Sequence, residues 1–422
     1  MTEVGARLSL KAIGKQDEYL INDDPEHSFF KYEHKQHTEF TKIHRSTKVK
    51  CPEGQNNWPF GDTVKISFEP KLMEDLLSNM YINIKFPGVF GGINLADQLG
   101  RHIIKSVTMR VDDMVVEKFH DDWGIIYDEL YLDASEKRTK RYTLNRNLAE
   151  NSSSLPGNHF LSGFDSELMI PIPMFFSRKY EGDEYATNKP NRPYFPLCAI
   201  YKQKIVFDIE FHEQSFFTDH ATPIKLEGFD VVTEEIAVSL EERTFLMTHR
   251  QLFVTDIVKK HPSVQGKTTL RLELVPNIPV KTINWFLRDT VTTYENRFNL
   301  SINDTYSIVN SHFGPVMDSA KLYIKGEDLP NIPLTKHPFY KYVIPFNSRL
   351  SRPNRNIYTY TFSMNPINVE PSGSLDFGQL QSNKTILEVK LVGGIDKDYE
   401  LHLYYVGYQS FAFENGFMAL AY

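Results

Sequence analysis

Cysteine is scarce in this sequence of 422 residues, which contains two, Cys51 and Cys198. Two cysteines cannot form a disulfide framework, so the sequence indicates a protein of a reducing compartment. Long apolar runs are also lacking, since no stretch approaches the roughly 20 residues that a membrane-spanning helix needs. The first residues, MTEVGARLSLKAIG, lack the apolar core of a signal peptide. These absences predict a soluble protein that is made in the cytosol.

An excess of positive charge is lacking as well. The chain has 47 basic and 54 acidic residues and a net charge of -7, whereas dedicated nucleic-acid binders usually carry a basic excess. We therefore expect no specific nucleic-acid partner. Two basic groups, which we expect to lie in loops, are best explained as solvated surface, with a docking patch for an acidic partner or lipid head groups as the alternative. The groups are Lys42, Arg45, Lys48 and Lys50, and Lys137, Arg138, Lys140 and Arg141.

The short motifs of common catalytic and cofactor sites are lacking too. Residues 265–269, QGKTT, contain Gly-Lys-Thr, but a phosphate-binding loop needs another glycine where His261 stands. Asp208, Glu210 and His212 share one face of a predicted strand and could hold a metal ion, although a solvent-facing surface explains them more simply. We predict no catalytic residue, no cofactor and no metal ion, and hence a protein that is not an enzyme.

Aromatic and alternating apolar residues are abundant. Phe (30) and Tyr (22) are numerous, and both favour strands. Apolar and polar residues alternate in many short segments, enough for roughly sixteen half-buried strands. Residues 102–119 contain two apolar runs around Asp112 and Asp113, which predicts a hairpin. The clearest single strand places four apolar residues on one face: Ile205, Phe207, Ile209 and Phe211.

Helical patterns are sparse. The strongest covers residues 121–138, where apolar residues recur at helical spacing and Asp121 or Asp122 could cap the first turn. Residues 71–79 are consistent with a single turn or a short helix. Many strands with little helix predict an all-β fold of two tandem eight-stranded jelly-roll β-sandwiches, with one or two short helices.

The alternation weakens after Phe211, and this break divides the predicted fold. A long polar insert, residues 178–194, lies between two strands of the first half, and inserts of that length are usually functional or disordered. We expect an N-terminal arm over 1–24, a first jelly roll over 25–215, a linker over 216–229 and a second jelly roll over 230–422.

Several motifs follow one another in a recognisable order. A Gln-Asp pair leads to Phe-Phe-Lys, a hairpin precedes a Trp-containing segment, Pro-x-Pro precedes Pro-Leu, and Tyr-x-Tyr-x-Phe precedes Pro-Ser-Gly. This order resembles the major capsid proteins of nucleocytoplasmic large DNA viruses, such as iridoviruses, phycodnaviruses and mimiviruses, over most of the chain. The matching residues are Gln16, Asp17, Phe29, Phe30, Lys31, Trp123, Pro171, Pro173, Pro196, Leu197, Tyr358, Tyr360, Phe362, Pro371, Ser372 and Gly373.

Two departures mark a divergent member of that family. The family commonly has Gly-Gly at the hairpin turn where this chain has Asp112 and Asp113. After Pro-Ser-Gly it usually continues to Asn-Phe-Ser-Arg, whereas residues 376–379 read Asp-Phe-Gly-Gln. Proline fixes its own φ and glycine tolerates positive φ, so the Pro-Ser-Gly trio predicts a sharp turn between two strands, a fold determinant and not a binding site.

The resemblance implies a structural capsid protein that forms homotrimers. Such trimers are pseudo-hexagonal capsomers that tile an icosahedral shell, so the implied partners are the chain itself, neighbouring trimers, and minor capsid and penton proteins. The internal virion membrane is a further implied contact. The implied location is the virion, with synthesis and assembly in the host cytoplasm. We expect the outward loops to include residues 178–194 and 327–356.

Two alternatives remain open from the sequence. Within the same fold, the chain could be a minor capsid paralogue or a scaffold that is later shed. From another class, a carbohydrate-binding or carbohydrate-cleaving double jelly roll would use exposed aromatic side chains such as Trp58 to stack on sugars. Packing in the core or at an interface is the simpler expectation for Trp58, Trp123 and Trp285.

Overall fold

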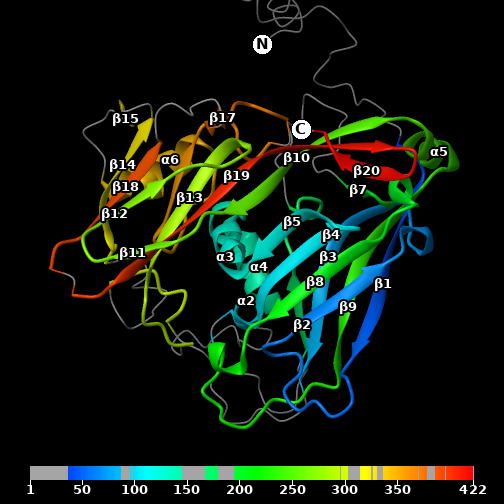
Figure 1. Cartoon of the computed structure of the whole chain (residues 1–422), viewed down its shortest axis with the longest axis horizontal. Helices are drawn as coiled ribbons and strands as arrows, with labels where there is room; N and C mark the ends of the chain where they lie inside the picture. Colours follow the sequence, from blue (N-terminus) through cyan, green and yellow to red (C-terminus); the bar gives the residue numbers. More distant parts are fainter. Residues whose placement is uncertain are drawn as a thin grey trace, which may run out of the picture. The chain divides into compact units, whose positions relative to one another are not determined.

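The strands, most of which bury one face, form four antiparallel sheets, and these sheets form two sandwiches (Figure 1). Phe40–Tyr422 form one compact unit. The computed structural model describes residues 37–86, 96, 98–144, 167–178, 194–294, 296–302, 314–324, 327–329, 336–368, 370–377, 385–394 and 396–421. The predicted all-β class with two sandwiches is confirmed in these residues.

The first sandwich has nine described strands, in one sheet of five and one sheet of four. One sheet has the order β1-β9-β3-β6, with the short β7 beside β3, and the other has the order β2-β8-β4-β5. The strands are β1 (Phe40–Lys50), β2 (Thr63–Phe68), β3 (Leu76–Lys85), β4 (Ile104–Val111), β5 (Met114–His120), β6 (Glu167–Pro171), β7 (Phe195–Pro196), β8 (Ile205–Phe211) and β9 (Gly228–Val238).

The second sandwich repeats this plan. One sheet has the order β10-β19-β13-β16, with the short strands β11, β17 and β20 at its margins, and the other has the order β12-β18-β14-β15. The strands are β10 (Gln251–Lys260), β11 (Val264–Gly266), β12 (Thr269–Glu273), β13 (Pro279–Asp289), β14 (Met317–Ile324), β15 (Glu327–Leu329), β16 (Ile357–Thr361), β17 (Leu375–Asp376), β18 (Ile386–Leu391), β19 (Tyr399–Glu414) and β20 (Phe417–Leu420).

The hairpin and the clearest strand are confirmed. Strands β4 and β5 pair from Ser106 opposite His120 to Val111 opposite Met114. Asp112 turns the chain at a φ of 50°, which aspartate tolerates better than most residues. In β8 the four predicted apolar residues are all buried, and the three residues between them are half-buried.

Strand β9 differs from the expected division. The linker was expected over 216–229 and the second jelly roll from 230. Instead β9 pairs along its length with β1, from Phe40 opposite Val238 to Lys50 opposite Gly228, and also with β3. Residues 230–238 therefore complete the first sandwich, because their alternating side chains close its sheet. The strands of the second sandwich begin with β10.

The predicted helix over 121–138 is wrong as a single element. It is two helices, because Asp133 and Glu136 form a reciprocal capping box that begins the second: the Asp133 carboxylate accepts from the Glu136 N–H at 2.7 Å, and the Glu136 carboxylate accepts from the Asp133 N–H at 3.0 Å. The α-helices are α2 (Leu99–Ile103), α3 (Asp121–Leu130), α4 (Ala134–Leu144), α5 (Leu240–Thr248) and α6 (Ile344–Asn347).

Single helical turns complete the structure. The predicted turn or short helix over 71–79 is partly wrong, because residues from Leu76 onward belong to β3, where pairing with β9 overrides local preference. None of the described helices is long and apolar enough to cross a membrane. The turns are η3 (Pro70–Leu72), η4 (Leu197–Ile200), η5 (Gln214–Phe216) and the π-helical η6 (Phe339–Val343).

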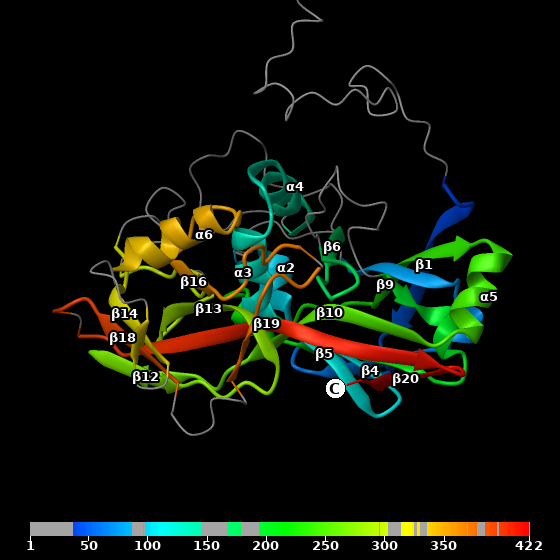
Figure 2. The ribbon, with the colours of Figure 1, turned by 90° about the horizontal axis from the view of Figure 1, so that it is seen from above.

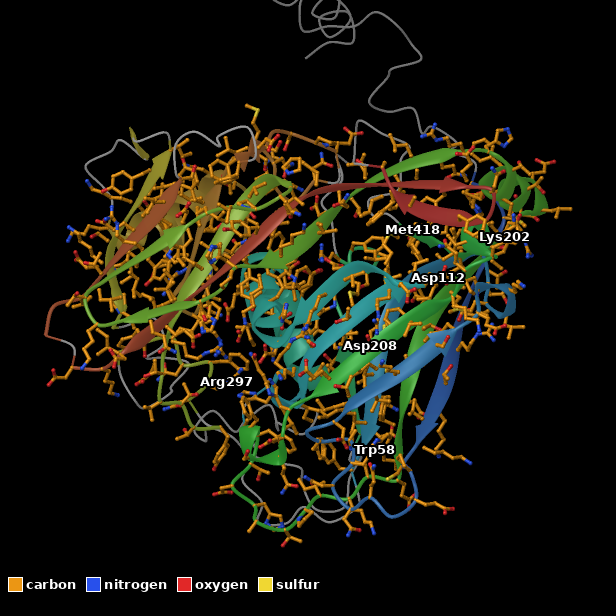
Figure 3. All side chains as sticks on the ribbon, viewed as in Figure 1. Trp58, Asp112, Lys202, Asp208, Arg297 and Met418 are labelled. Atoms are coloured by element: carbon orange, nitrogen blue, oxygen red, sulfur yellow. The ribbon has the colours of Figure 1, made fainter. Side chains whose placement is uncertain are left out.

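The end of β19 and all of β20 reach back to the first sandwich. The N–H of Met418 in β20 donates to the Gln203 side chain at 2.6 Å, and the N–H of Lys202 donates to the Gly416 carbonyl at 3.3 Å. Met418 and Lys202 lie near each other in Figure 3. This hairpin therefore ties the second sandwich to the segment before β8.

Candidate functional site: the joint between the two sandwiches

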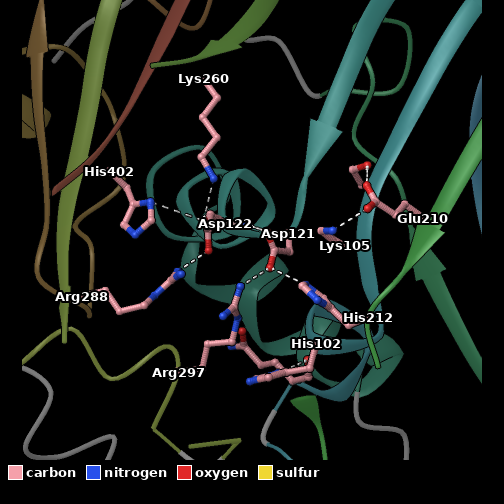
Figure 4. A network of polar contacts seen from close by, with 12 residues as sticks. His102, Lys105, Asp121, Asp122, Glu210, His212, Lys260, Arg288, Arg297 and His402 are labelled. Carbon is pink, nitrogen blue, oxygen red and sulfur yellow. Dashed lines mark hydrogen bonds and ion pairs between the residues drawn. The ribbon is translucent and has the colours of Figure 1, made fainter. Parts of the chain in front are cut away.

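Helix α3 is the centre of the contact between the two sandwiches (Figure 2). It follows β5 of the first sandwich, and all ten of its residues are buried. Two adjacent carboxylates, Asp121 and Asp122, begin the helix and meet basic side chains of the second sandwich (Figure 4). A buried charge is tolerated only when it is paired and hydrogen-bonded, so the surroundings of these two residues decide whether the joint is stable.

Asp121 is paired on both sides of the joint. One of its carboxylate oxygens accepts a hydrogen bond from Arg297 at 2.9 Å and another from His212 at 3.0 Å. Its other oxygen accepts the N–H of Asp122 at 2.7 Å. Burial alone would raise the pKa of Asp121, but the His212 hydrogen bond and the charges of Arg297 and Arg288 outweigh it and hold that pKa well below its usual range. Asp121 is therefore ionised at neutral pH.

Asp122 collects four partners from the second sandwich. Arg288 on β13 donates to one oxygen, and the other oxygen lies 3.5 Å from the Lys260 ammonium and 3.4 Å from the Tyr404 hydroxyl. His402 lies 4.0 Å away. Burial opposes ionisation, yet Arg288 lowers the pKa of Asp122. Arg288 and the carboxylates stabilise each other's charged forms, because Asp122 and Asp121 raise the pKa of the Arg288 guanidinium despite its burial.

A third carboxylate, Glu117 on β5, joins the same two sandwiches. It pairs with Arg178 and also accepts the N–H of Val258 in β10 at 3.3 Å. Arg178 in turn donates to the Asp256 carbonyl at 3.0 Å. Asp256 forms an ion pair with Lys281 at 2.8 Å, and burial raises its pKa.

The C-terminal end of α3 continues this pattern with two more carboxylates. Asp128 binds Arg101 at 3.1 Å and Lys140 at 2.5 Å, both within the first sandwich and its helices. Glu129 reaches the second sandwich, where its carboxylate accepts the N–H of Asn354 at 2.7 Å and pairs with Arg355 at 3.4 Å. The ionic contacts thus run along the whole length of α3.

An aromatic cluster closes the joint beside the ionic contacts. Phe175 and Phe195 come from the first sandwich, and Phe253, Phe411 and Phe413 come from the second. The Phe175 ring lies 5.9 Å from the Phe411 ring, and the Phe195 ring lies 6.0 Å from the Phe413 ring. Such edge and tilted contacts between buried rings stabilise an interface beyond the area that they bury. Ionic and apolar contacts together hold the two sandwiches as one body.

Two of the four basic residues of α4, Lys137 and Lys140, belong to this joint and not to a solvated surface. Lys140 is half-buried and contacts Asp128, and desolvation lowers the pKa of its ammonium to about 8 although Asp128 opposes this. Lys137 donates to the Arg352 carbonyl at 2.9 Å and lies 3.9 Å from Glu129. Two of the four α4 basic residues are therefore structural.

The other basic group lies on β1 and not in a loop. Arg45 binds the buried Glu235 at 3.0 Å, and Lys42 lies 3.8 Å from Glu234. Lys48 and Lys50 are exposed on the same face of the strand as Lys42. The prediction of a solvated surface fits these two lysines.

Three of the family-motif residues lie at or beside the joint. Trp123 on α3 is buried, with its ring 6.0 Å from the Tyr404 ring and the Arg178 guanidinium 6.0 Å above it. The Pro-x-Pro motif supplies acceptors: the Pro171 carbonyl accepts from Arg101 at 3.1 Å, and the Pro173 carbonyl accepts from Arg178 at 3.2 Å.

The Pro-Leu and Tyr-x-Tyr-x-Phe residues lie elsewhere, in the two sandwiches. Pro196 pairs with β3, and Leu197 is fully buried in η4. Tyr358 is buried opposite Trp285, 6.0 Å between rings. The Tyr360 ring packs 5.3 Å from the half-buried Phe362 ring. The structure therefore does not gather the motif residues into one site.

The Pro-Ser-Gly trio turns the chain between β16 and β17 and is pinned by Ser372. The Ser372 hydroxyl donates to the Asn365 carbonyl at 2.9 Å and accepts the Asn365 N–H at 3.0 Å, while its own N–H donates to the Tyr408 hydroxyl. Gly373 has a φ of 129°, and a Cβ there would lie 3.0 Å from the Phe362 carbonyl oxygen. Pro371 precedes them and is exposed.

We expect Ser372→Ala to lower the free energy of unfolding by about 1–2 kcal/mol, since it removes the hydrogen-bond partner of the backbone N–H and of the backbone carbonyl of Asn365. Urea unfolding followed by fluorescence measures the change. Ser374→Ala, at an exposed position two residues away, is the control and should change stability by less than about 0.5 kcal/mol. Equal effects of the two variants would contradict a structural role for Ser372.

Other expected site residues fall outside the described part of the chain. Gln16, Asp17, Phe29, Phe30 and Lys31 all lie there, as do residues 179–193 of the insert 178–194 and residues 330–335 of the segment 327–356. The role of these loops as outward surface stays a prediction.

Two interpretations of α3 and β8 were wrong. The helix cap was assigned to Asp121 or Asp122, but His120 precedes the first turn and both carboxylates serve the joint. His212 was assigned to the solvent face with Asp208 and Glu210, yet it is buried on Asp121, whereas Asp208 pairs with Arg110 and Glu210 with Lys105. No group of three or more potential metal ligands occurs within the described ranges.

The sequence offered no signal for the second half of the joint. Arg288, Arg297 and His402 are far from α3 in the chain, so only the folded arrangement brings them to Asp121 and Asp122. The three tryptophans are buried as expected. Trp58 stacks on the Phe229 ring at 5.5 Å and is therefore closed to a sugar.

Comparison with family models covers most of the chain. The model described as "Major capsid protein N-terminus" matches residues 28–238, and that described as "Large eukaryotic DNA virus major capsid protein" matches residues 234–398. The two matches meet at 234–238, where β9 ends. This junction agrees with the pairing of β9 in the first sandwich.

Curated relatives and solved structures have the same description. The major capsid protein of Pyramimonas orientalis virus is 20% identical over 454 residues, covering 99% of each chain, and that of Paramecium bursaria Chlorella virus 1 is 20% identical over 417 residues, covering 92% of this chain and 87% of the relative. The PBCV-1 virus capsid model aligns with a TM-score of 0.71 at 17% identity, over 94% of this chain and all (100%) of the other. The Faustovirus major capsid protein aligns with a TM-score of 0.65 at 12% identity, over 97% and 98%.

Proposed function

Because this chain belongs to the family of large eukaryotic DNA virus major capsid proteins, we propose that it is the repeating structural unit of a virion shell. The family is one of structural capsid components, and the chain is not an enzyme. The observation that carries the proposal is the fold itself, two sandwiches of the same plan in one chain. Its agreement with the PBCV-1 capsid fold over 94% of the chain supports this.

The joint explains how one chain can serve as a tile. A shell facet transmits load from each copy to the next, so the two sandwiches must keep a fixed angle. The paired carboxylates of α3 and the aromatic cluster around Phe175 provide this, since buried charge pairs and packed rings have few alternative arrangements.

We propose that three copies assemble into a homotrimer with six sandwiches, the pseudo-hexagonal capsomer implied by the family resemblance. Capsomers would then contact neighbouring trimers, minor capsid and penton proteins and the internal virion membrane, after synthesis in the host cytoplasm. Contacts within such a permanent trimer are expected to be large and apolar at their centres. Contacts between trimers are expected to be smaller and more polar.

Purified protein is therefore expected to sediment at three times 49.0 kDa, that is 147 kDa, at micromolar concentration. Analytical ultracentrifugation gives the mass, and negative-stain electron microscopy gives the outline, which should be pseudo-hexagonal. A protein that remains at 49.0 kDa throughout the concentration series would contradict the proposal.

The protein composition of purified particles distinguishes a principal shell protein from a minor capsid paralogue or a scaffold of the same fold. A principal shell protein is abundant in mature virions, a minor paralogue is present at low copy number, and a scaffold is present only in immature particles. Quantitative mass spectrometry of purified mature and immature particles distinguishes the three. Absence from mature virions would exclude the shell role.

A further inference from the structure

Two histidines of the first sandwich lie against aromatic rings of the second sandwich at the joint. The first, His102 on α2, is 3% exposed, and its ring lies 4.6 Å from the ring of Phe298. The Arg297 guanidinium lies 5.8 Å from the centre of the same Phe298 ring. The buried Nε2 atom of His102 has no hydrogen-bond partner among the described residues. His102 therefore contributes to the joint through packing, with no acceptor at this nitrogen for a proton.

The second histidine, His120, occupies a similar place at the end of β5. Its half-buried ring lies 6.2 Å from the ring of Tyr404 on β19. The Lys260 ammonium on β10 lies 5.7 Å from the centre of the same Tyr404 ring. Each of the two histidines thus faces an aromatic ring of the second sandwich that already carries a cation of the second sandwich.

The charged groups around these two histidines are mostly basic. Those that face His102 are Arg297, Arg355 and Asp121, and those that face His120 are Lys260, Lys118, Asp121 and Asp122. Both aspartates are already paired with arginines of the second sandwich. Burial, with help from the neighbouring cations, lowers the pKa of His102 to about 3 and that of His120 to about 4. The joint is therefore closed with both rings neutral.

The other two histidines of the joint are arranged differently, because each has a carboxylate within reach. His212 hydrogen-bonds Asp121 at 3.0 Å, and His402 lies 3.3 Å from Glu400. A proton on either of these rings has an anionic partner. In the described part of the chain, no carboxylate forms an ion pair with His102 or His120. A proton on either of them adds a positive charge without a partner.

We propose that the joint is acid-sensitive, so that protonation of His102 and His120 separates the two sandwiches while each sandwich stays folded. Each protonated ring places a positive charge near a cation of the other sandwich, Arg297 or Lys260, and like charges repel strongly where water is excluded. The repulsion acts across the joint and not within either sandwich. The fixed angle between the sandwiches is then kept at neutral pH and lost in acid. This inference goes beyond the proposed function and does not depend on it.

The direction and size of the effect follow from the pKa values. Separation exposes both rings to water, where the pKa of histidine is 6.5, whereas in the closed joint the pKa values are about 3 and about 4. The closed joint is therefore fully favoured above pH 6.5. Below this pH each histidine shifts the equilibrium towards separation by about tenfold per pH unit. The two together shift it by about 10⁴-fold between pH 6.5 and pH 4.5.

Hydrogen–deuterium exchange of the wild-type protein at pH 7, 6, 5 and 4.5 tests the proposal without any variant. Helix α3 reports on the joint, because all ten of its residues are buried and an isolated helix of this length is marginal in water. After correction for the intrinsic pH dependence of exchange, α3 is expected to lose protection at pH 4.5, whereas β8 of the first sandwich and β18 of the second keep theirs. Simultaneous loss in all three elements, or protection of α3 that persists at pH 4.5, would overturn the inference.

Substitution of the two histidines tests which groups take up the protons. His102→Gln and His120→Gln each remove one titrating ring, so each is expected to make the loss of α3 protection at pH 4.5 about 100-fold smaller. His249→Gln, at an exposed position after α5, is the matched control and should behave like the wild type. Circular dichroism at pH 7 verifies that the variants fold. An unchanged loss in both histidine variants would assign the effect to other groups and overturn the inference, and the proposed function would be unaffected.

Discussion

Replacing Asp122 by alanine is expected to lower the free energy of unfolding by about 3–5 kcal/mol, because removing one partner of a buried ion pair leaves the others desolvated and unpaired. Asp122 is 2% exposed, and its loss leaves the positive charges of Arg288 and Lys260 without this carboxylate partner. Urea unfolding at pH 7 measures the change. Separate transitions for the two sandwiches are also expected in this variant, because its joint is weakened.

The control for this variant is an exposed ion pair. Asp318 pairs with Lys336 at 2.7 Å, but its side chain is 41% exposed, so Asp318→Asn should cost less than about 1 kcal/mol. A double variant, Asp122→Leu with Arg288→Met, should recover part of the lost stability, because an apolar pair of similar size avoids the unpaired charge. If Asp122→Ala were no more destabilising than Asp318→Asn, the ionic joint would not be important for stability.

Acidification from pH 7 to pH 4 is expected to destabilise the fold by about 3 kcal/mol through His102 alone. Each pH unit that lies between the pKa of His102 in the unfolded chain and its lower pKa in the folded chain costs about 1.36 kcal/mol. Burial, with help from the charge of Arg297, lowers the pKa of His102 from 6.5 to about 3. The unfolded chain therefore takes up the proton first. The stability contributed by the neutral ring is complete above pH 6.5 and is lost as the pH falls towards 3.

Histidines dominate this pH window, because the lowered pKa values of Asp121 and Asp122 act only below their usual range near 3.8. His120 adds to the effect, since burial lowers its pKa to about 4. Urea unfolding at pH 7, 6, 5 and 4 gives the slope. His102→Gln should flatten the slope, whereas His249→Gln, at an exposed position after α5, should leave it unchanged. A slope that is the same in wild type and His102→Gln would refute the assignment.

The sheets were predictable from the sequence because they depend on local alternation. The burial of Ile205, Phe207, Ile209 and Phe211 follows directly from a period of two, and the hairpin at Asp112 from two apolar runs around a polar turn. The boundary at β9 was not predictable in this way. Its position depends on which sandwich the strand pairs with, and pairing partners 190 residues apart, such as Arg45 and Glu235, leave no mark in a local window.

The joint was less predictable still. Asp121 and Asp122 have the appearance of a helix cap, since carboxylates are common in the first turn of any helix. Their actual role requires Arg288 and Arg297 from another sandwich. Similarly, His212 stands in phase with Asp208 and Glu210, but β8 ends at Phe211 and the chain then turns His212 inward. Local sequence patterns predict which face of a strand is buried. They do not predict which distant residues pack against that face.

The return of β19 and β20 to the first sandwich has a consequence for biosynthesis. Phe175 and Phe195 leave the ribosome more than 200 residues before Phe411 and Phe413, the rings that cover them. A nascent first sandwich therefore presents an uncovered aromatic surface to the cytosol while the second is still being translated. Contacts of such long sequence separation form slowly, and intermediates with exposed apolar surface aggregate readily. Transient shielding of that surface during translation would be most valuable in an infected cell, where many copies are made at once.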